Sequence, residues 1–347
     1  MLMKLRFRIF PILVCLVLMS SCVRGSQGYD SSCEYAEFFD IKDSLLIVVS
    51  PYDGSVQTIS LTRPINKLVC MSSSQVAALA EIGADSLVAA VSGLKYLTNH
   101  RLHERTCPDI GYEASLDYEK ILDIQPDLLV TYTISASEPQ HIAKLKSLSV
   151  PVLVIYEQCE SHPLAKAEYV RLFGALIGRQ ERADSCFSSV RDRYCALTDS
   201  VSGSDKKRLS VLMNIPYGDA WYIPGAGNYM TRMIYDAGGE VLGAMPGRNS
   251  STVSLERAYE LSQDADIWLN PGHCRTLDEL SGIHHLFPKF GPLSKELSIY
   301  NNTLRMNSEG GNDFWESGAV RPDLVLEDLV RIFSSQPGEL HYYLELK

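Results

Sequence analysis

The chain has 347 residues, 46% of them hydrophobic, and its 32 basic and 42 acidic side chains give a formal net charge of −10. A net negative chain without a run of basic residues lacks the electrostatic footprint that binds phosphate backbones, so we expect no nucleic-acid partner.

The first 21 residues are expected to be a bacterial lipoprotein signal peptide. Three basic residues precede an apolar run from Ile9 to Met19, and Ser20, Ser21 and Cys22 follow it. The apolar run is too short for a spanning helix, although an uncleaved anchor is the alternative. Cleavage would remove three basic residues and no acidic one, which takes the net charge from −10 to −13. We therefore expect a protein of the periplasm or cell envelope that is held to a bacterial membrane through lipid on Cys22.

Residues 22–40 are predicted to be a flexible tether because they are largely small and polar and show no periodicity. The N-terminal lobe is assigned to residues 41–165. It begins with a hairpin of two strands, Leu45–Val49 and Val56–Leu61. Strands and helices then alternate, which predicts a parallel sheet. The expected strands are 67–71, 87–91, 128–132 and 152–155, and the expected helices are 75–82 and 138–148.

Residues 166–200 are predicted to be helical, with Gly178 dividing two helices. The second helix carries an apolar stripe at helical spacing, formed by Ala183, Phe187, Val190, Tyr194 and Leu197. The C-terminal lobe is assigned to residues 201–347, where strands are expected at 209–213 and 267–270 and helices at 229–237, 255–261 and 322–333.

One sequence pattern occurs twice. Ser115–Glu119 opens a segment that ends in Asp127–Val130, and Ser254–Glu256 opens one that ends in Asp266–Leu269. Both copies predict a capped helix, a turn and a buried strand. The fold class predicted from this repeat is α/β, with two similar lobes joined by one long helix and a cleft between them.

Cysteine and histidine residues indicate no metal centre. After removal of Cys15 and acylation of Cys22, seven scattered cysteines remain, and none stands in a CxxC motif. Seven cannot all pair, and whether any form disulfides is left open. His100 and His103, like the adjacent His284 and His285, lack a recognisable ligand framework, so we expect no bare-metal site.

The chain resembles the helical-backbone substrate-binding proteins of ABC importers, which carry iron siderophores, heme and cobalamin. The resemblance rests on Leu68–Ser74 leading into a helix, on Glu119–Val130, on Val253–Glu256, and on the order of these segments around the long helix. Gly310–Gly318, with Arg321, Pro322 and Asp323, is similar to a subgroup of iron-complex and cobalamin binders.

This resemblance implies a monomeric, lipid-anchored receptor and no enzyme. It would hold a siderophore, heme or cobalamin as cargo between its lobes and present it to a membrane permease with a cytoplasmic ATPase. A cobalamin-specific receptor is one alternative. The rivals of another class are an extracytoplasmic chelatase-type enzyme, which would need convergent His or Glu side chains, and a surface lipoprotein that captures chelates without transport.

Ligand-binding candidates lie where strands end, because clefts of α/β sheets form there. The candidates are mostly aromatic residues in loops or at strand ends of both lobes: Tyr96, Tyr112, Tyr132, Trp221, Tyr222, Arg248, His273 and Trp315. No catalytic residue is predicted.

Two carboxylates are candidates for permease docking. With Asp117 and Ser254 as N-cap residues, Glu119 and Glu256 both fall at the second helical position, one in each lobe. The helix dipole alone would favour them there. In the family that the chain resembles, an acidic residue at this place in each lobe pairs with arginines of the permease.

Overall fold

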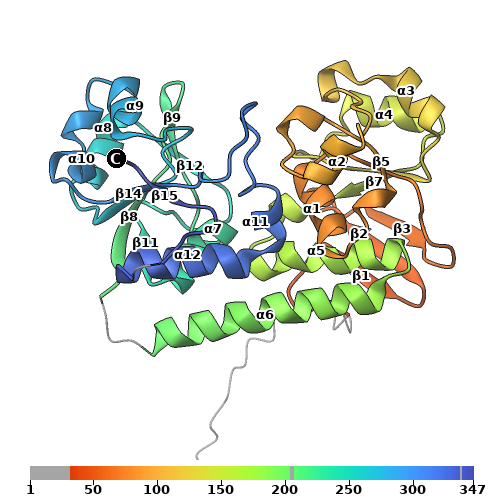
Figure 1. Cartoon of the computed structure of the whole chain (residues 1–347), viewed down its shortest axis with the longest axis horizontal. Helices are drawn as coiled ribbons and strands as arrows, with labels where there is room; N and C mark the ends of the chain where they lie inside the picture. The colour runs from red at the N-terminus through yellow and green to blue at the C-terminus, as the bar shows by residue number, and fades with distance from the viewer. Residues whose placement is uncertain (1–31, 204–206, 337) are drawn as a thin grey trace, which may run out of the picture. The chain divides into compact units, whose positions relative to one another are not determined.

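A computed structural model describes residues 32–203, 207–336 and 338–347. The signal peptide, Cys22 and most of the expected tether therefore lie outside the described residues. Residues 31–347 form one compact unit, in which two α/β lobes lie side by side (Figure 1).

The first lobe is built on a parallel sheet with the strand order β5-β4-β6-β7. The residues of its two central strands are buried, apart from Tyr132 at the end of the second, as expected for a sheet covered on both faces. The strands are β4 (Leu68–Cys70), β5 (Val88–Val91), β6 (Leu128–Tyr132) and β7 (Val152–Ile155), and the helices are α1 (Ser73–Glu81), α2 (His100–Glu104), α3 (Tyr118–Ile124) and α4 (Gln140–Ser147).

A small antiparallel sheet lies beside this lobe. It contains the predicted hairpin, β2 (Leu45–Val49) and β3 (Val56–Ser60), together with β1 (Phe39–Lys42). The Gln57 side chain donates to the Val154 carbonyl at 2.9 Å and accepts from the Val154 N–H at 3.0 Å. Gln57 thus pairs with β7 as a neighbouring strand would, and it satisfies the edge of the parallel sheet.

The second lobe has the strand order β11-β8-β13-β14-β15, in which only β15 is antiparallel, and a separate sheet β12-β10-β9. The strands are β8 (Leu209–Met213), β9 (Pro216–Tyr217), β10 (Ala220–Ile223), β11 (Gly239–Val241), β12 (Ser251–Val253), β13 (Ile267–Leu269), β14 (Ile299–Asn301) and β15 (Leu344–Glu345). The helices are α7 (Tyr229–Asp236), α8 (Leu255–Ser262), α9 (Leu277–Ile283), α10 (Gly291–Ser294), α11 (Ser317–Val320) and α12 (Pro322–Ser334).

The repeated sequence pattern has the same structural role in both lobes. The Asp127 N–H donates to the Lys67 carbonyl at 2.9 Å, and the Asp127 carboxylate accepts from the Lys67 N–H at 2.9 Å. Asp266 makes the equivalent pair of bonds with Ser210, both at 2.8 Å. In each lobe this aspartate joins two adjacent parallel strands at their start, which confirms that the repeat reflects similar lobes.

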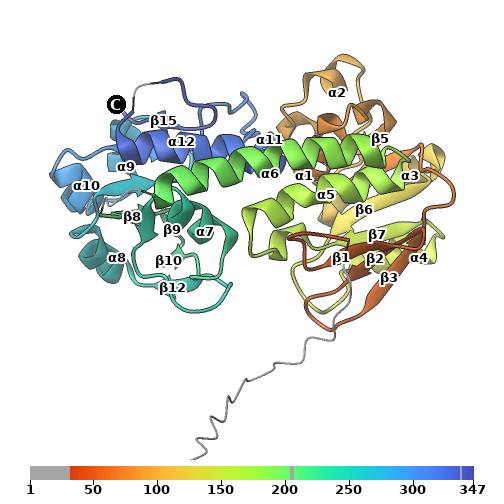
Figure 2. The same cartoon turned by 90° about the horizontal axis from the view of Figure 1, so that it is seen from below.

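A long helix, α6 (Gln180–Ser202), runs along both lobes (Figure 2). Four residues of the predicted stripe are its buried residues, Ala183, Phe187, Val190 and Tyr194. The stripe packs on α5 (Pro163–Leu176) of the first lobe and on α12 of the second. An added Cβ on Gly174 would lie 2.3 Å from the Ala183 Cβ, so glycine permits the close approach of α5 and α6. The predicted α/β fold with a connecting helix is confirmed.

The end of the expected flexible tether, residues 32–40, is instead fixed to the first lobe, because two buried carboxylates accept hydrogen bonds from its backbone and β1 begins within it. The Glu168 carboxylate accepts from the backbone N–H groups of Tyr35 and Ala36, both at 2.8 Å. Glu160, only 2% exposed, accepts from the N–H groups of Glu37 and Phe38. Burial, reinforced by the Glu37 carboxylate, raises the pKa of Glu160 to about 7.

This raised pKa predicts a pH-dependent stability. Because the pKa of Glu160 lies above its ordinary value of 4.5, its stabilising contribution is complete below pH 4.5 and is lost as the pH rises through 7. The substitution Glu160→Gln removes this titration. Between pH 5 and pH 8 the free energy of unfolding of the wild type should therefore fall relative to that of the variant, by up to about 3 kcal/mol. Urea titrations at several pH values measure this difference. Exposed Glu240→Gln is the control, and pH profiles of Glu160→Gln and wild type that stay parallel would contradict the assignment.

Candidate functional site

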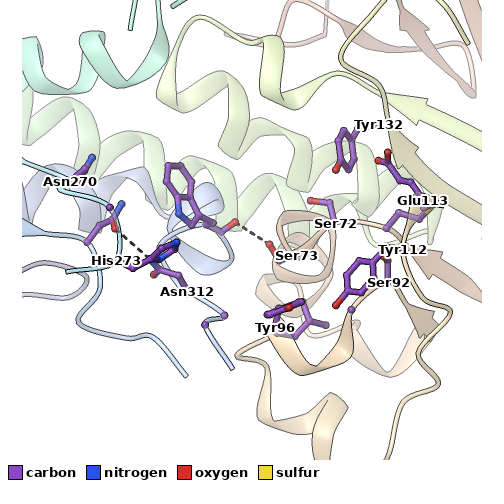
Figure 3. Close-up of a pocket in the computed structure, with 18 of the residues that line it drawn as sticks. Ser72, Ser73, Ser92, Tyr96, Tyr112, Glu113, Tyr132, Asn270, His273 and Asn312 are labelled. Atoms are coloured by element: carbon purple, nitrogen blue, oxygen red, sulfur yellow. Dashed lines mark hydrogen bonds between the residues drawn. The ribbon is translucent and has the colours of Figure 1, made fainter. Parts of the chain in front are cut away.

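A cleft of about 840 Å³ lies between the two lobes. Several lining residues lie within three positions of the end of a parallel strand: Ser72 and Ser73 after β4, Ser92 after β5, Asn214 after β8 and Asn270 after β13. Both sheets therefore turn the carboxyl ends of their strands toward the same cavity, which is where open α/β sheets bind ligands. Figure 3 shows side chains of the two lobes on opposite sides of the cleft.

The first-lobe wall is aromatic. The rings of Tyr96 and Tyr112 lie 6.0 Å apart between centroids and are tilted by 50°. Gly93 has φ +70°, and an added Cβ would lie 2.8 Å from the Tyr112 ring, so this packing requires glycine. Tyr132 ends β6 and lies near Glu113 (Figure 3). Burial raises the pKa of Tyr132, and the nearby Glu113 carboxylate adds to the shift.

The second-lobe wall is rich in amides. Asn214 and Asn270 adopt left-handed backbone conformations with φ +67° and +57°, which asparagine tolerates better than most residues. The Asn312 amide donates to the Asn302 side-chain oxygen at 3.3 Å. The exposed His273 side chain lies on the same wall (Figure 3).

Trp315 contributes the indole of the cleft lining and is 51% exposed. The backbone carbonyl of Trp315 accepts from the Ser73 hydroxyl at 3.3 Å, which links this residue to the start of α1. Its ring packs edge-on against the buried Phe314 at 4.7 Å between centroids. This ring is held by packing on one side while it faces the cleft on the other.

The charge of the described lining residues is low. They include one carboxylate, Glu113, and one histidine, His273, and neither lysine nor arginine is among them. Four asparagines and three serines supply hydrogen-bond donors and acceptors: Asn214, Asn270, Asn302, Asn312, Ser72, Ser73 and Ser92. Such a wall suits a large, nearly neutral ligand with polar substituents.

In the described residues, no three His, Cys, Asp or Glu side chains are grouped so that they could hold a metal ion. None of the helices in this part of the chain combines the length and apolarity needed to cross a membrane. The cysteines at positions 70, 107, 159, 186, 195 and 274 are free thiols, and those at 70, 107 and 274 are buried.

Five of the eight predicted ligand-binding residues lie in the lining: Tyr96, Tyr112, Tyr132, His273 and Trp315. Their binding role stays a prediction. The prediction for Trp221 is wrong, because its ring is fully buried in the second-lobe core and stacks on Phe290. Its indole N–H donates to the Met213 carbonyl at 2.8 Å, so Trp221 supports the end of β8 from behind.

Tyr222 and Arg248 also lie outside the lining. Side chains alternate along a strand, so Tyr222 points away from the core side taken by its neighbour Trp221 in β10. Arg248 forms a salt bridge with Glu37 at 2.7 Å. This pair joins the β11–β12 loop to the start of the first lobe. The Arg248 guanidinium therefore binds the Glu37 carboxylate and does not line the cleft.

The four asparagines of the lining are not among the residues predicted from the sequence, which are aromatic side chains, one arginine and one histidine. The signal was present, since Asn214 directly follows the predicted strand 209–213 and Asn270 is the last residue of the predicted strand 267–270. Glu113 and Asn312 lie in loops whose direction the sequence does not indicate.

The two docking candidates are exposed at the N-termini of α3 and α8. Asp117 and Ser254 are the N-caps, and their side chains accept from the N–H groups of Lys120 and Arg257. This capping confirms the predicted helical position of Glu119 and Glu256. The backbone N–H of Glu256 and the Ser254 hydroxyl lower the pKa of Glu256.

Known proteins resemble the chain in sequence and in fold. The family profile described as periplasmic binding protein matches residues 68–286. An uncharacterized lipoprotein of Methanocaldococcus jannaschii is 23% identical over 297 residues, which are 81% of this chain and 69% of that protein. A cobalamin-binding protein of Halobacterium salinarum is 23% identical over 257 residues, which are 74% of this chain and 66% of that protein. The chain thus spans about two thirds of the length of these relatives.

Solved structures share the fold at low sequence identity. A periplasmic heme binding protein of Pseudomonas aeruginosa has a TM-score of 0.63 at 16% identity, over 82% of this chain and 98% of that one. A periplasmic vitamin B12 binding protein of Vibrio cholerae has a TM-score of 0.59 at 12% identity, over 80% and 99% of the two chains.

Proposed function

Because the chain belongs to the periplasmic binding protein family, we propose that it is the solute-binding component of an ABC importer and captures a bulky metal chelate between its lobes. The observation that carries this proposal is the interlobe cleft, which combines aromatic rings with amide and hydroxyl groups. Its volume of about 840 Å³ falls within the usual range of ligand pockets.

The low charge of the cleft favours cobalamin over heme and over anionic siderophores. Heme carries two propionates and ferric catecholate siderophores are anionic, so their sites need cationic side chains to offset the cost of desolvating those charges. The described lining offers Glu113 and no lysine or arginine. Cobalamin instead has a rim of uncharged amides, which can exchange hydrogen bonds with Asn214, Asn270 and the serines, while the corrin ring packs on the aromatic side chains.

Calorimetric titration of the protein with cyanocobalamin, hemin and a ferric catecholate complex tests this order. We expect cyanocobalamin to bind most tightly, with an affinity that changes little between low and high salt because few charges take part. Tighter binding of hemin or of the catecholate complex would reject the cobalamin assignment. Binding of none of the three would reject chelate capture itself.

The rival function as a chelatase-type enzyme requires two convergent acid–base groups beside the cargo. Glu113 and His273 are the available pair, and they lie on opposite walls of the cleft (Figure 3). This separation favours binding without chemistry. Prolonged incubation of cyanocobalamin with the protein checks this point. A binding protein should return the cobalamin with its cobalt, whereas a chelatase would release the metal.

We further propose an extracytoplasmic location, in the periplasm or cell envelope, with a lipid on Cys22 and a monomeric state. The permease would recognise Glu119 on the first lobe and Glu256 on the second. Figure 1 places α3 and α8, which carry these residues, on the side of the lobes away from α6. Mass spectrometry of the membrane-extracted protein checks the acylation of Cys22.

A further inference from the structure

A second connection between the lobes is formed by residues 305–316, here called the strap. It follows β14 of the second lobe and ends at α11, which packs against α1 and α5. Figure 1 shows α11 between the two lobes. Met306 and Asn312 form an antiparallel bridge within the strap. The strap is therefore a hairpin-like excursion of the second-lobe chain toward the first lobe.

Polar contacts join the strap to the first-lobe loop of residues 95–99. The Asn307 amide donates to the carbonyls of Lys95 and Leu97, at 3.0 and 3.1 Å. The Thr98 N–H donates to the Glu316 carboxylate at 2.6 Å, and the Thr98 hydroxyl donates to the Asp313 carboxylate at 3.0 Å.

These carboxylates are buried in the contact. Glu316 is 3% exposed and Asp313 is 4% exposed. Burial raises the pKa of Glu316, and the nearby Asp313 carboxylate adds to the shift. A buried carboxylate is costly unless hydrogen bonds compensate it, and two of these bonds come from Thr98 of the other lobe. Each of the two buried carboxylates therefore accepts a hydrogen bond from the first-lobe loop.

The close approach of Gly311 to the Tyr96 carbonyl is independent evidence for the contact between the strap and the loop. A Cβ added to Gly311 would lie 2.0 Å from the Tyr96 carbonyl oxygen and 2.7 Å from the Asn307 amide nitrogen. The backbone of the strap therefore touches the backbone of the loop, and only glycine allows this approach.

Both partners of this contact also form the cleft. Tyr96 stands on the loop, whereas Asn312 and Trp315 stand on the strap, and all three line the cavity. On its other side the strap borders a second cavity of about 1180 Å³, which Leu97 and Asn307 help to line. The strap is thus a wall of the cleft that is pinned to the opposite lobe.

We propose that Asn307, Asp313 and Glu316 are positioning residues, which hold the strap on the loop of residues 95–99 and so set the spacing of Tyr96 and Trp315 across the cleft. The identity of the ligand rests on the proposed function. The contact between the strap and the loop rests on the hydrogen bonds and the close approach described above. The strap restrains the lobes in addition to α6. The cleft is consequently organised before the ligand arrives, which reduces the ordering cost of binding.

Gly311→Ala tests the contact in the ligand-free protein, with Gly282→Ala as the matched control because no heavy atom lies within 4 Å of the added Cβ there. Hydrogen exchange should show the Thr98 amide at least about tenfold less protected in Gly311→Ala, with strands β4 and β8 unchanged. Gly282→Ala should match the wild type. Unchanged protection of Thr98 in Gly311→Ala would overturn the proposal.

Glu316 variants provide a second route if Gly311→Ala does not fold. Glu316→Ala should expose the Thr98 amide, whereas Glu316→Gln retains an acceptor oxygen and should restore most of the protection. With cyanocobalamin as probe, Glu316→Ala should raise the Kd at least about tenfold and Glu316→Gln should raise it less. Loss of protection with an unchanged Kd would refute the positioning role. If the wild type does not bind cyanocobalamin, the proposed cargo fails and the exchange measurement alone decides on the strap.

Discussion

Trp315→Ala should weaken cyanocobalamin binding by about 1–3 kcal/mol, roughly 5- to 150-fold in Kd. The indole is half exposed to the cleft while Phe314 supports it from behind, so its conformation costs little entropy on binding. Aromatic anchors of this kind carry much of the energy of an interface. Calorimetric titration measures the effect directly.

Two control variants separate stacking from general loss of aromatic surface. Trp315→Phe keeps a ring at the cleft and should lose less affinity than Trp315→Ala. Tyr217→Ala removes a ring that is 84% exposed and lies outside the lining, so its Kd should equal that of the wild type. A Trp315→Ala protein with wild-type affinity for the best of the three chelates would show that other residues hold the cargo.

The double variant Glu119→Ala with Glu256→Ala should retain cargo affinity but lose most of the stimulation of the permease-associated ATPase. Both side chains are exposed, one on each lobe, and neither lines the cleft. Complementary charges at an interface act on association, so the loss should shrink at high salt, where screening removes the contribution of the carboxylates. ATP hydrolysis and transport in proteoliposomes containing the permease are the measurements.

A matched control uses the same two helical regions. Asp123 lies toward the end of α3 and Asp264 just beyond α8, and both are exposed. Asp123→Ala with Asp264→Ala removes the same charge from other places, so it should stimulate the ATPase as the wild type does. Equal behaviour of the two double variants would leave Glu119 and Glu256 with a role in their helices only.

The regular elements could be predicted because their signals are local. Buried runs such as Leu128–Tyr132, Val152–Ile155 and Leu209–Met213 form strands with the predicted bounds. The apolar stripe of α6 determines which face of that helix is buried. The short strands β9, β14 and β15 were not predicted, because their two or three residues do not stand within a longer aliphatic run and their pairing depends on the partner strand.

The positions of Trp221 and Trp315 show that local sequence signals do not determine which side chains face the cleft. The sequence places Trp221 at the end of a loop after the predicted strand 209–213 and Trp315 in a glycine-rich loop, and both are predicted to line the cleft. Trp221 alternates with Tyr222 along β10, and the pairing of β10 with β12 over the aromatic core decides that Trp221 is the inner residue. The direction of the Trp315 ring depends on Phe314 and Ser73, which belong to different elements.

Sequence alone thus determined two repeated lobes, a long helix between them and a set of strand ends that border a cleft. Only the tertiary structure decided which side chains face that cleft and that the strap closes one wall of it. The Thr98 N–H and the Glu316 carboxylate are 218 residues apart in the chain. Contacts of this kind arise when packed lobes bring distant loops together, and no periodicity or propensity within either loop specifies its partner.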